Sequence, residues 1–162
     1  MVNLYSINTV LLAAAVMVAH GLLTRPLAAQ PVSLNEVVSF NERGLADEDG
    51  DHPDWLEIFN GSNQAINLRG YGLSDDEAQP FRWLMPARVV PVGGFVVVFA
   101  SGKDRTNGVN LHANFSIRAE GEPLFLTRPE GGRADQWTGG NIPRDYSYGR
   151  PPDGSADAGH WM

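Results

Sequence analysis

Cysteine is absent from this 162-residue chain, and lysine is nearly so, with Lys103 the single example beside eleven arginines. Without cysteine the chain has no disulfide, no thiol nucleophile and no thiolate ligand for a metal. Basic residues are also outnumbered, 12 against 19 acidic residues, which gives a formal net charge of −7. An acidic chain is poorly suited to electrostatic binding of nucleic acid or of an anionic membrane.

Long apolar runs are missing as well. The longest, Val10 to Ala19, is too short to cross a hydrocarbon core of roughly 30 Å at about 1.5 Å per helical residue. It has the length of the apolar region of a secretory signal, and the small residues of "PLAAQ" follow it. We therefore predict a signal peptide over residues 1–29, export to the periplasm, the cell surface or the medium, and no stable membrane insertion after cleavage.

A sustained helical period of apolar residues is the third absence. Short apolar runs instead alternate with Gly- and Pro-rich turn signals about every 8 to 12 residues, which is typical of an all-β sandwich or barrel. The run "FVVVFAS" is apolar on both faces and predicts a central strand covered on both sides. The sequence "EGGR" predicts a hairpin that joins "PLFLT" to "ADQWT".

The first predicted strand, "VSLNEVVSFN", breaks its own alternation. Glu36 falls in the apolar phase and Val37 in the polar phase. Either a β-bulge that resets the register or a paired inward carboxylate explains the break. Paired carboxylates such as Glu36 and Glu57 can also carry out glycoside hydrolysis. We favour a structural role, in which a strand glutamate is partnered by an arginine such as Arg82 or Arg118.

The densest cluster of charge lies in "ADEDGDHPDWLEIFN", where an acidic loop, residues 47–54, precedes a predicted strand. Calcium needs six to eight oxygen ligands, and Asp-rich loops supply them. An EF-hand is excluded, because Asp47, Asp49 and Asp51 fit positions 1, 3 and 5 but His52 replaces the required glycine and Ile58 the required glutamate. A looser calcium site at Asp47, Asp49 and Asp51 stays open, as does a solvated or partner-facing loop.

The histidines suggest no zinc site by their spacing. His52 lies in the acidic loop and could join two aspartates, but the sequence has no H-x-H or H-E-x-x-H pattern. His112, in "LHANF", is predicted to lie at a strand edge and to bond to backbone. We predict no catalytic residue and no cofactor other than the calcium considered above.

Several motifs together resemble the lamin-tail domain, an immunoglobulin-like β-sandwich. They are "ADEDGDHPDWLEIFN", "INLRGYGLSDD", "FRWLMP" with "PVGGFVVVFASG", "LHANFSIRAEGEPLFLT" and "YSYGRPPDG". The resemblance implies a non-catalytic interaction module, and bacterial members of this family are typically exported. Because such members commonly continue further, residues 151–162 look like an irregular, truncated tail after a sandwich domain at residues 30–150.

Three function classes follow from these observations. The first is an exported binding or scaffolding module whose partner is a protein or a cell-surface component, and not a nucleic acid. The second is a calcium-dependent adhesion or stabilising module that uses loop 47–54. The third is a secreted hydrolase or its accessory domain.

Overall fold

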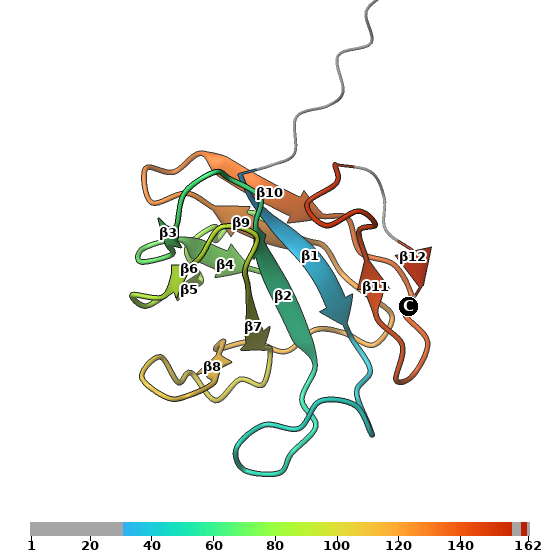
Figure 1. The fold of residues 1–162 in the computed structure, drawn as a ribbon. Helices are drawn as coiled ribbons and strands as arrows, with labels where there is room; N and C mark the ends of the chain where they lie inside the picture. The colour runs from blue at the N-terminus through green and yellow to red at the C-terminus, as the bar shows by residue number, and fades with distance from the viewer. Residues whose placement is uncertain (1–30, 157–159, 162) are drawn as a thin grey trace, which may run out of the picture.

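Strands and loops make up the described part of the chain, residues 31–156 and 160–161 of a computed structural model (Figure 1). One sheet has six strands, in the order β12 (His160–Trp161), β11 (Tyr148–Gly149), β1 (Val32–Val38), β2 (Trp55–Asn60), β7 (Phe95–Phe99) and β8 (Leu111–His112). A second sheet has four, in the order β10 (Arg133–Trp137), β9 (Leu124–Thr127), β4 (Gly72–Ser74) and β5 (Trp83–Leu84). Strands β3 (Ile66–Asn67) and β6 (Val89–Val90) form a separate pair.

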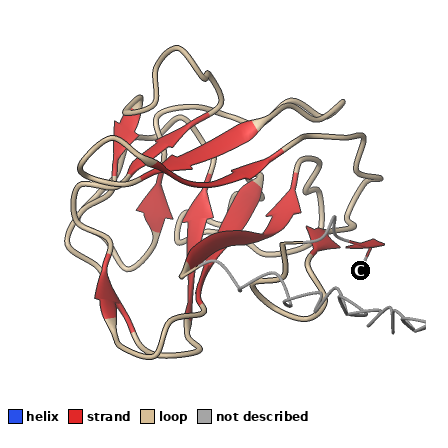
Figure 2. Cartoon of the chain, turned by 90° about the horizontal axis from the view of Figure 1, so that it is seen from above, coloured by secondary structure: helices blue, strands red, loops and turns tan. Residues whose placement is uncertain are grey.

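The two larger sheets pack as a sandwich. In Figure 1, β1, β2 and β7 lie side by side with β4 and β9 behind them, and Figure 2 shows the same layers from above. Within the described ranges no helix is long and apolar enough to cross a membrane. The predicted all-β, immunoglobulin-like sandwich is therefore confirmed, whereas the predicted signal peptide lies outside the described residues.

The core is built from alternate side chains of both sheets. In β2, Leu56 and Ile58 are fully buried, and the intervening Trp55, Glu57 and Phe59 are half-buried on the opposite face. Across the sandwich, the core receives fully buried Leu124 and Leu126 from β9. Each such side chain contributes about 1.5–3 kcal/mol of burial free energy, so the alternation read in "WLEIFN" sets which face of the sheet is inside.

Of the two explanations offered for the break in the first strand, the bulge is present in β1 and the inward carboxylate is not. Leu34 pairs with Ile58 and Glu36 with Glu57, so Asn35 is the extra residue. The proposed arginine partners for the strand glutamates are wrong, because Arg82 pairs with Asp75 and Arg118 with Glu122. Glu36 instead stands directly across from Glu57, both on the face turned away from the core.

Strand β7 differs from its prediction. Its residues Val98 and Phe99 are buried, but Val96 and Val97 are only half-buried and Phe95 is 44% exposed. Strand β8 pairs only with the last two residues of β7, Val98 and Phe99. The beginning of β7 therefore lies near the edge of the sheet. The run "FVVVF" is therefore covered on one face only along part of its length.

The C-terminal elements close the sandwich. The predicted hairpin is confirmed, with β9 and β10 antiparallel and joined by a turn in which Arg128 N–H donates to Gly132 O. Beyond it, β11 pairs with β1, and β12 pairs with β11. The segment that we expected to be irregular thus includes one short strand.

A buried ion pair ties Arg150, the residue after β11, and strand β10 to the bulge. Arg150 Nη1 lies 2.7 Å from Asp135 Oδ2, and both side chains are 8% exposed. The same Asp135 oxygen accepts a hydrogen bond of 2.8 Å from the backbone N–H of Leu34, and Arg150 Nη2 donates to Gln136 O. The pair therefore satisfies a backbone donor at the bulge, where the strand pairing is interrupted.

Candidate functional site

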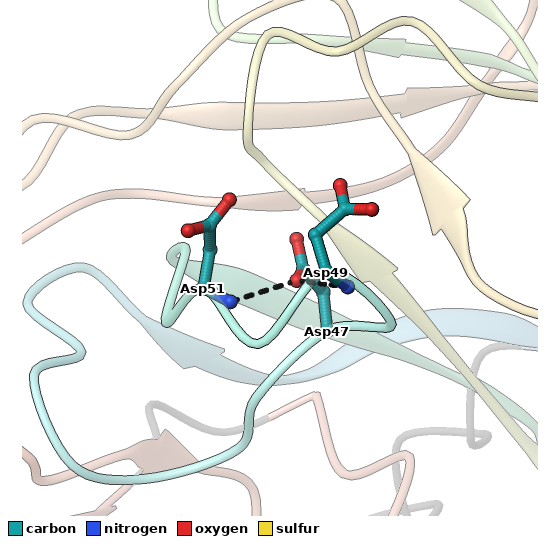
Figure 3. Close-up of side chains that lie close together, drawn as sticks. All are labelled: Asp47, Asp49 and Asp51. Carbon is teal, nitrogen blue, oxygen red and sulfur yellow. Dashed lines mark hydrogen bonds between the residues drawn. The ribbon is translucent and has the colours of Figure 1, made fainter.

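The acidic loop between β1 and β2 is folded around the side chain of Asp47. Its Oδ1 accepts hydrogen bonds from the backbone N–H groups of Asp49 at 2.9 Å and Asp51 at 3.0 Å (Figure 3). Gly50 has a φ of 81°, a conformation that side chains disfavour, and its N–H donates to Asp47 O. The Asp47 side chain is fully buried. It supplies the acceptor that the backbone N–H groups of this turn would otherwise lack.

The three predicted ligand residues are brought together. One oxygen from each of Asp47, Asp49 and Asp51 lies within 4.8 Å of the others, a spacing at which they could hold a metal ion. Asp49 and Asp51 face solvent, with side chains 40% and 65% exposed. The geometry that the sequence predicted is present, and whether calcium binds stays a prediction.

A cation of the protein itself lies among these carboxylates. Lys103 Nζ is 2.5 Å from Asp47 Oδ2, 2.7 Å from Asp49 Oδ2 and 2.8 Å from Asp51 Oδ2. A metal ion at this position would have to displace the ammonium group. Sequence reasoning missed Lys103, which lies more than fifty residues away; the only signal was that it is the single lysine of the chain.

Glu48 makes a second set of contacts with the loop that follows β7. Its carboxylate accepts hydrogen bonds from Asn110 at 2.7 Å, from His112 Nε2 at 3.0 Å and from Arg105 at 3.1 Å. Arg105 also reaches Asp49 at 2.7 Å. These contacts join loop 42–54 to loop 101–112, and we call the residues that make them the loop clasp. Its members are Asp47, Glu48, Asp49, Asp51, Lys103, Arg105, Asn110 and His112.

His112 differs from its prediction. It does lie in an edge strand, but its ring bonds to side chains: Nε2 to Glu48, and Nδ1 at 2.9 Å from Ser101 Oγ. The ring is fully buried and stacks on Phe99 at 5.3 Å. Burial explains the difference, because buried ring nitrogens need partners. The backbone N–H and C=O of His112 itself are paired with Arg105.

A comparison with protein families decides what kind of domain this is. A model of the Lamin Tail Domain family matches residues 26–140. The chain belongs to the Lamin Tail Domain family. The match includes β1 to β10 and the loop clasp, and it ends before β11 and β12. A search of curated proteins found no match.

Charges in the clasp of this lamin-tail domain hold one another ionised. Hydrogen bonds from Asn110 and His112 lower the pKa of Glu48 to about 2. Lys103 and Arg105 lower the pKa of Asp49, and the three aspartates raise the pKa of Lys103. Burial alone would raise the pKa of Asp47, but Lys103 and the two backbone donors outweigh it, and the pKa is lowered.

Two acidic-loop residues lie outside the clasp. His52 is exposed, and among the described residues it forms no ion pair with the three aspartates. Asp54 is half-buried and accepts one hydrogen bond, from Asn41 N–H at 3.2 Å. Burial raises the pKa of Asp54 to about 6, only partly offset by that donor. The acidic loop of this lamin-tail domain therefore contains a carboxyl group, that of Asp54, which lacks a cationic partner among the described residues.

The two glutamates considered for glycoside hydrolysis, Glu36 and Glu57, lie on the sheet face away from the core. Asn35 Nδ2 donates to Glu57 Oε1 at 3.1 Å and also to Asp153 Oδ1 at 3.0 Å. Burial raises the pKa of Glu57, and the charges of Glu36 and Asp153 raise it further against the effect of Asn35. The two glutamates lie side by side on neighbouring strands rather than on opposite sides of a cleft, which is not the arrangement that glycoside hydrolysis uses.

Proposed function

We propose that this lamin-tail domain is an exported, non-catalytic module that binds a protein or a cell-surface component. The loop clasp carries the proposal. The carboxylates of Glu48 and Asp49 in the acidic loop are engaged by Lys103, Arg105, Asn110 and His112, so they fix the shape of two loops instead of awaiting a ligand. A rigid sandwich with fixed loops suits recognition by surface contact.

Export is supported by the apolar run and the small residues of the N-terminal sequence. Expression of the full chain with a C-terminal tag, followed by intact-mass measurement of the secreted product, tests it. A mass corresponding to a chain that begins at Gln30 is expected. A product that retains residues 1–29 would contradict the predicted cleavage.

Binding is tested with the full chain immobilised through its C-terminus. Partners captured from a surface extract of the producing cells are identified, purified and titrated by calorimetry, where a saturable 1:1 isotherm is expected. The proposal fails if no captured component binds in purified form. It also fails if the chain hydrolyses peptide, ester or glycoside substrates and Glu57→Gln abolishes that activity.

The calcium-dependent module is the second candidate, favoured by the convergence of Asp47, Asp49 and Asp51. A ligand that binds only the folded state raises stability by RT ln(1 + [L]/Kd), so millimolar calcium would raise the Tm. The Asp49→Ala, Asp51→Ala double variant should lose that response. An unchanged Tm in calcium at millimolar concentration would remove this candidate, because Lys103 would then be the only cation in the site.

A further inference from the structure

The six-stranded sheet has an outer face, which we define by the side chains of Trp55, Glu57, Phe59, Phe95, Val97 and Glu36. Cross-strand pairing places them together, because Phe59 is opposite Phe95, and Glu57 lies between Glu36 and Val97. Residues directly opposite in an antiparallel pair project to the same side. The four-stranded sheet packs on the other side of β1, β2 and β7 (Figure 1).

One part of the outer face is apolar and only partly covered. The rings of Phe59 and Phe95 lie with centroids 4.9 Å apart, and Phe95 is 44% exposed. Val97, two residues from Phe95 on the same face, is half-buried; Trp55 is also half-buried but lies farther along β2, opposite the buried Phe99. Exposed aromatic side chains on a rigid sheet are the groups that protein interfaces favour.

The other part of the outer face is acidic, and it has no cationic partner within residues 31–156. Glu57 lies at the centre with Glu36 across the strand and Asp153 on the other side of the Asn35 amide. Within residues 31–156, none of these three carboxylates forms an ion pair. In the loop clasp, by contrast, Asp47, Asp49 and Asp51 all contact Lys103.

The acidic part is held in place. The Asn35 side chain is buried, and its Oδ1 accepts a hydrogen bond from Gly154 N–H at 2.9 Å, which fixes the segment that carries Asp153. Gly149 is the residue opposite Glu36 on β11, so no side chain from that position covers Glu36. Neighbouring carboxylates that are fixed close together attract a cation.

We infer that the outer face binds a basic segment of a partner protein, with an arginine or lysine side chain among Glu36, Glu57 and Asp153 and apolar side chains on Phe59 and Phe95. This inference rests on the proposed binding function and names the surface that performs it. Charge complementarity selects the partner, because a second copy of this acidic face would repel the first. The aromatic rings add a cation–π contribution at the border between the two parts.

The probe is a synthetic peptide in which arginine alternates with valine, compared with its uncharged counterpart in which citrulline replaces arginine. Each is titrated into the ¹⁵N-labelled full chain, and amide shifts in β1, β2 and β7 are followed. We expect saturable shifts in these strands with the arginine peptide only. Glu57→Gln, which keeps an acceptor for Asn35, should weaken binding by about fivefold or more.

Two further variants complete the test. Phe95→Ala should weaken binding as well, and Glu130→Gln, an exposed carboxyl in the turn between β9 and β10, should leave it unchanged. Unchanged melting temperatures show that each variant is folded. The inference is overturned if the shifts fall in loop 47–54 or scatter over the surface, if Glu57→Gln binds as tightly as the parent chain, or if the citrulline peptide binds equally well.

The same variants separate this inference from the proposed function. If a purified partner binds the parent chain and also binds Glu57→Gln and Phe95→Ala equally well, the domain is a binding module that uses another surface. If no purified partner binds the parent chain, the proposed function itself fails. Self-association of the chain through β1, β2 and β7 would name a second copy as the occupant and would contradict the basic partner.

Discussion

At the scale of single residues, the position of Lys103 changes the meaning of the acidic loop. Asp47, Asp49 and Asp51 are a plausible metal set when only their spacing is known, because carboxylates so close together need a cation. The fold supplies that cation from a loop that the sequence does not connect with them. Spacing could predict the need for a positive charge, but not that a lysine 56 residues from Asp47 would meet it.

Without the positive charge of Lys103, the carboxylates of Asp47, Asp49 and Asp51 should repel one another. Lys103→Met is expected to lower the Tm at neutral pH and low salt, and added salt should reduce the difference by screening the repulsion. Thermal melts at two salt concentrations measure both effects. Calcium should raise the Tm of this variant more than that of the parent chain; equal Tm values for variant and parent without calcium would show that Lys103 is not needed in the clasp.

The raised pKa of Asp54 predicts that stability falls as the pH rises. Its pKa in the folded chain is about 6, above the ordinary value of 3.8, so the folded state binds the proton more tightly than the unfolded state. Stability from this proton is fully present below about pH 4 and is lost as the pH rises through about 6.

Asp54→Asn, which can still accept the hydrogen bond from Asn41, should thus be more stable than the parent at pH 8 by about 1–2 kcal/mol, an amount reduced for the partial exposure of the group. The two chains should have equal stability near pH 4. Urea unfolding at both pH values makes the comparison. A variant that is less stable at pH 8 would mean that Asp54 has a favourable charged contact.

At the scale of elements, the bulge in β1 shows how far local pattern goes. The phase break at Glu36 left two explanations, a bulge or a paired inward carboxylate. The bulge is the one present, because a period of two cannot otherwise place both Leu34 and Val37 in the core. The pattern could not name the group that satisfies the freed N–H of Leu34. That group, Asp135, comes from β10 in the other sheet and is set by tertiary packing.

The pair of Asp135 and Arg150 should be essential to this junction. Arg150→Met leaves a buried carboxylate without its charge partner, so it is expected to cost about 3–5 kcal/mol in free energy of unfolding. Urea unfolding of both single variants and of the Asp135→Asn, Arg150→Met double variant measures the coupling. Additive losses would show that the two side chains stabilise the fold separately.

At the scale of the whole molecule, family motifs and strand alternation predicted the sandwich, its hairpin and its inward faces. The wrong predictions concern features that depend on other parts of the fold: how far a strand is covered by its neighbours, and which acidic residue lies nearest to an arginine. Strand β7 is apolar on both faces, yet it is half-open because β8 pairs with only its end. The arginine partners expected for Glu36 and Glu57 were also wrong, because other acids lie nearer to Arg82 and Arg118.

The loop clasp and Asp54 both contribute to the way in which the domain responds to acid. The pKa of Glu48 is lowered from 4.5 to about 2, and those of Asp47 and Asp49 are lowered as well, so their contribution is present above about pH 4.5 and is lost as the pH falls toward 2. Asp54 acts in the opposite direction at higher pH. These groups predict maximum stability between about pH 4.5 and 6.

The clasp joins two loops at one end of the sandwich, whereas the core lies between the sheets, so acid should affect the two regions in sequence. Hydrogen exchange measured from pH 6 down to about 2.5, corrected for the intrinsic rate, should show loss of protection in loops 42–54 and 101–112 before β2 and β9. Glu48→Gln should shift the loop transition while the exchange of β2 and β9 stays unchanged at pH 6. Simultaneous loss of protection in loops and core would instead mean that the clasp is part of the cooperative unit of the sandwich.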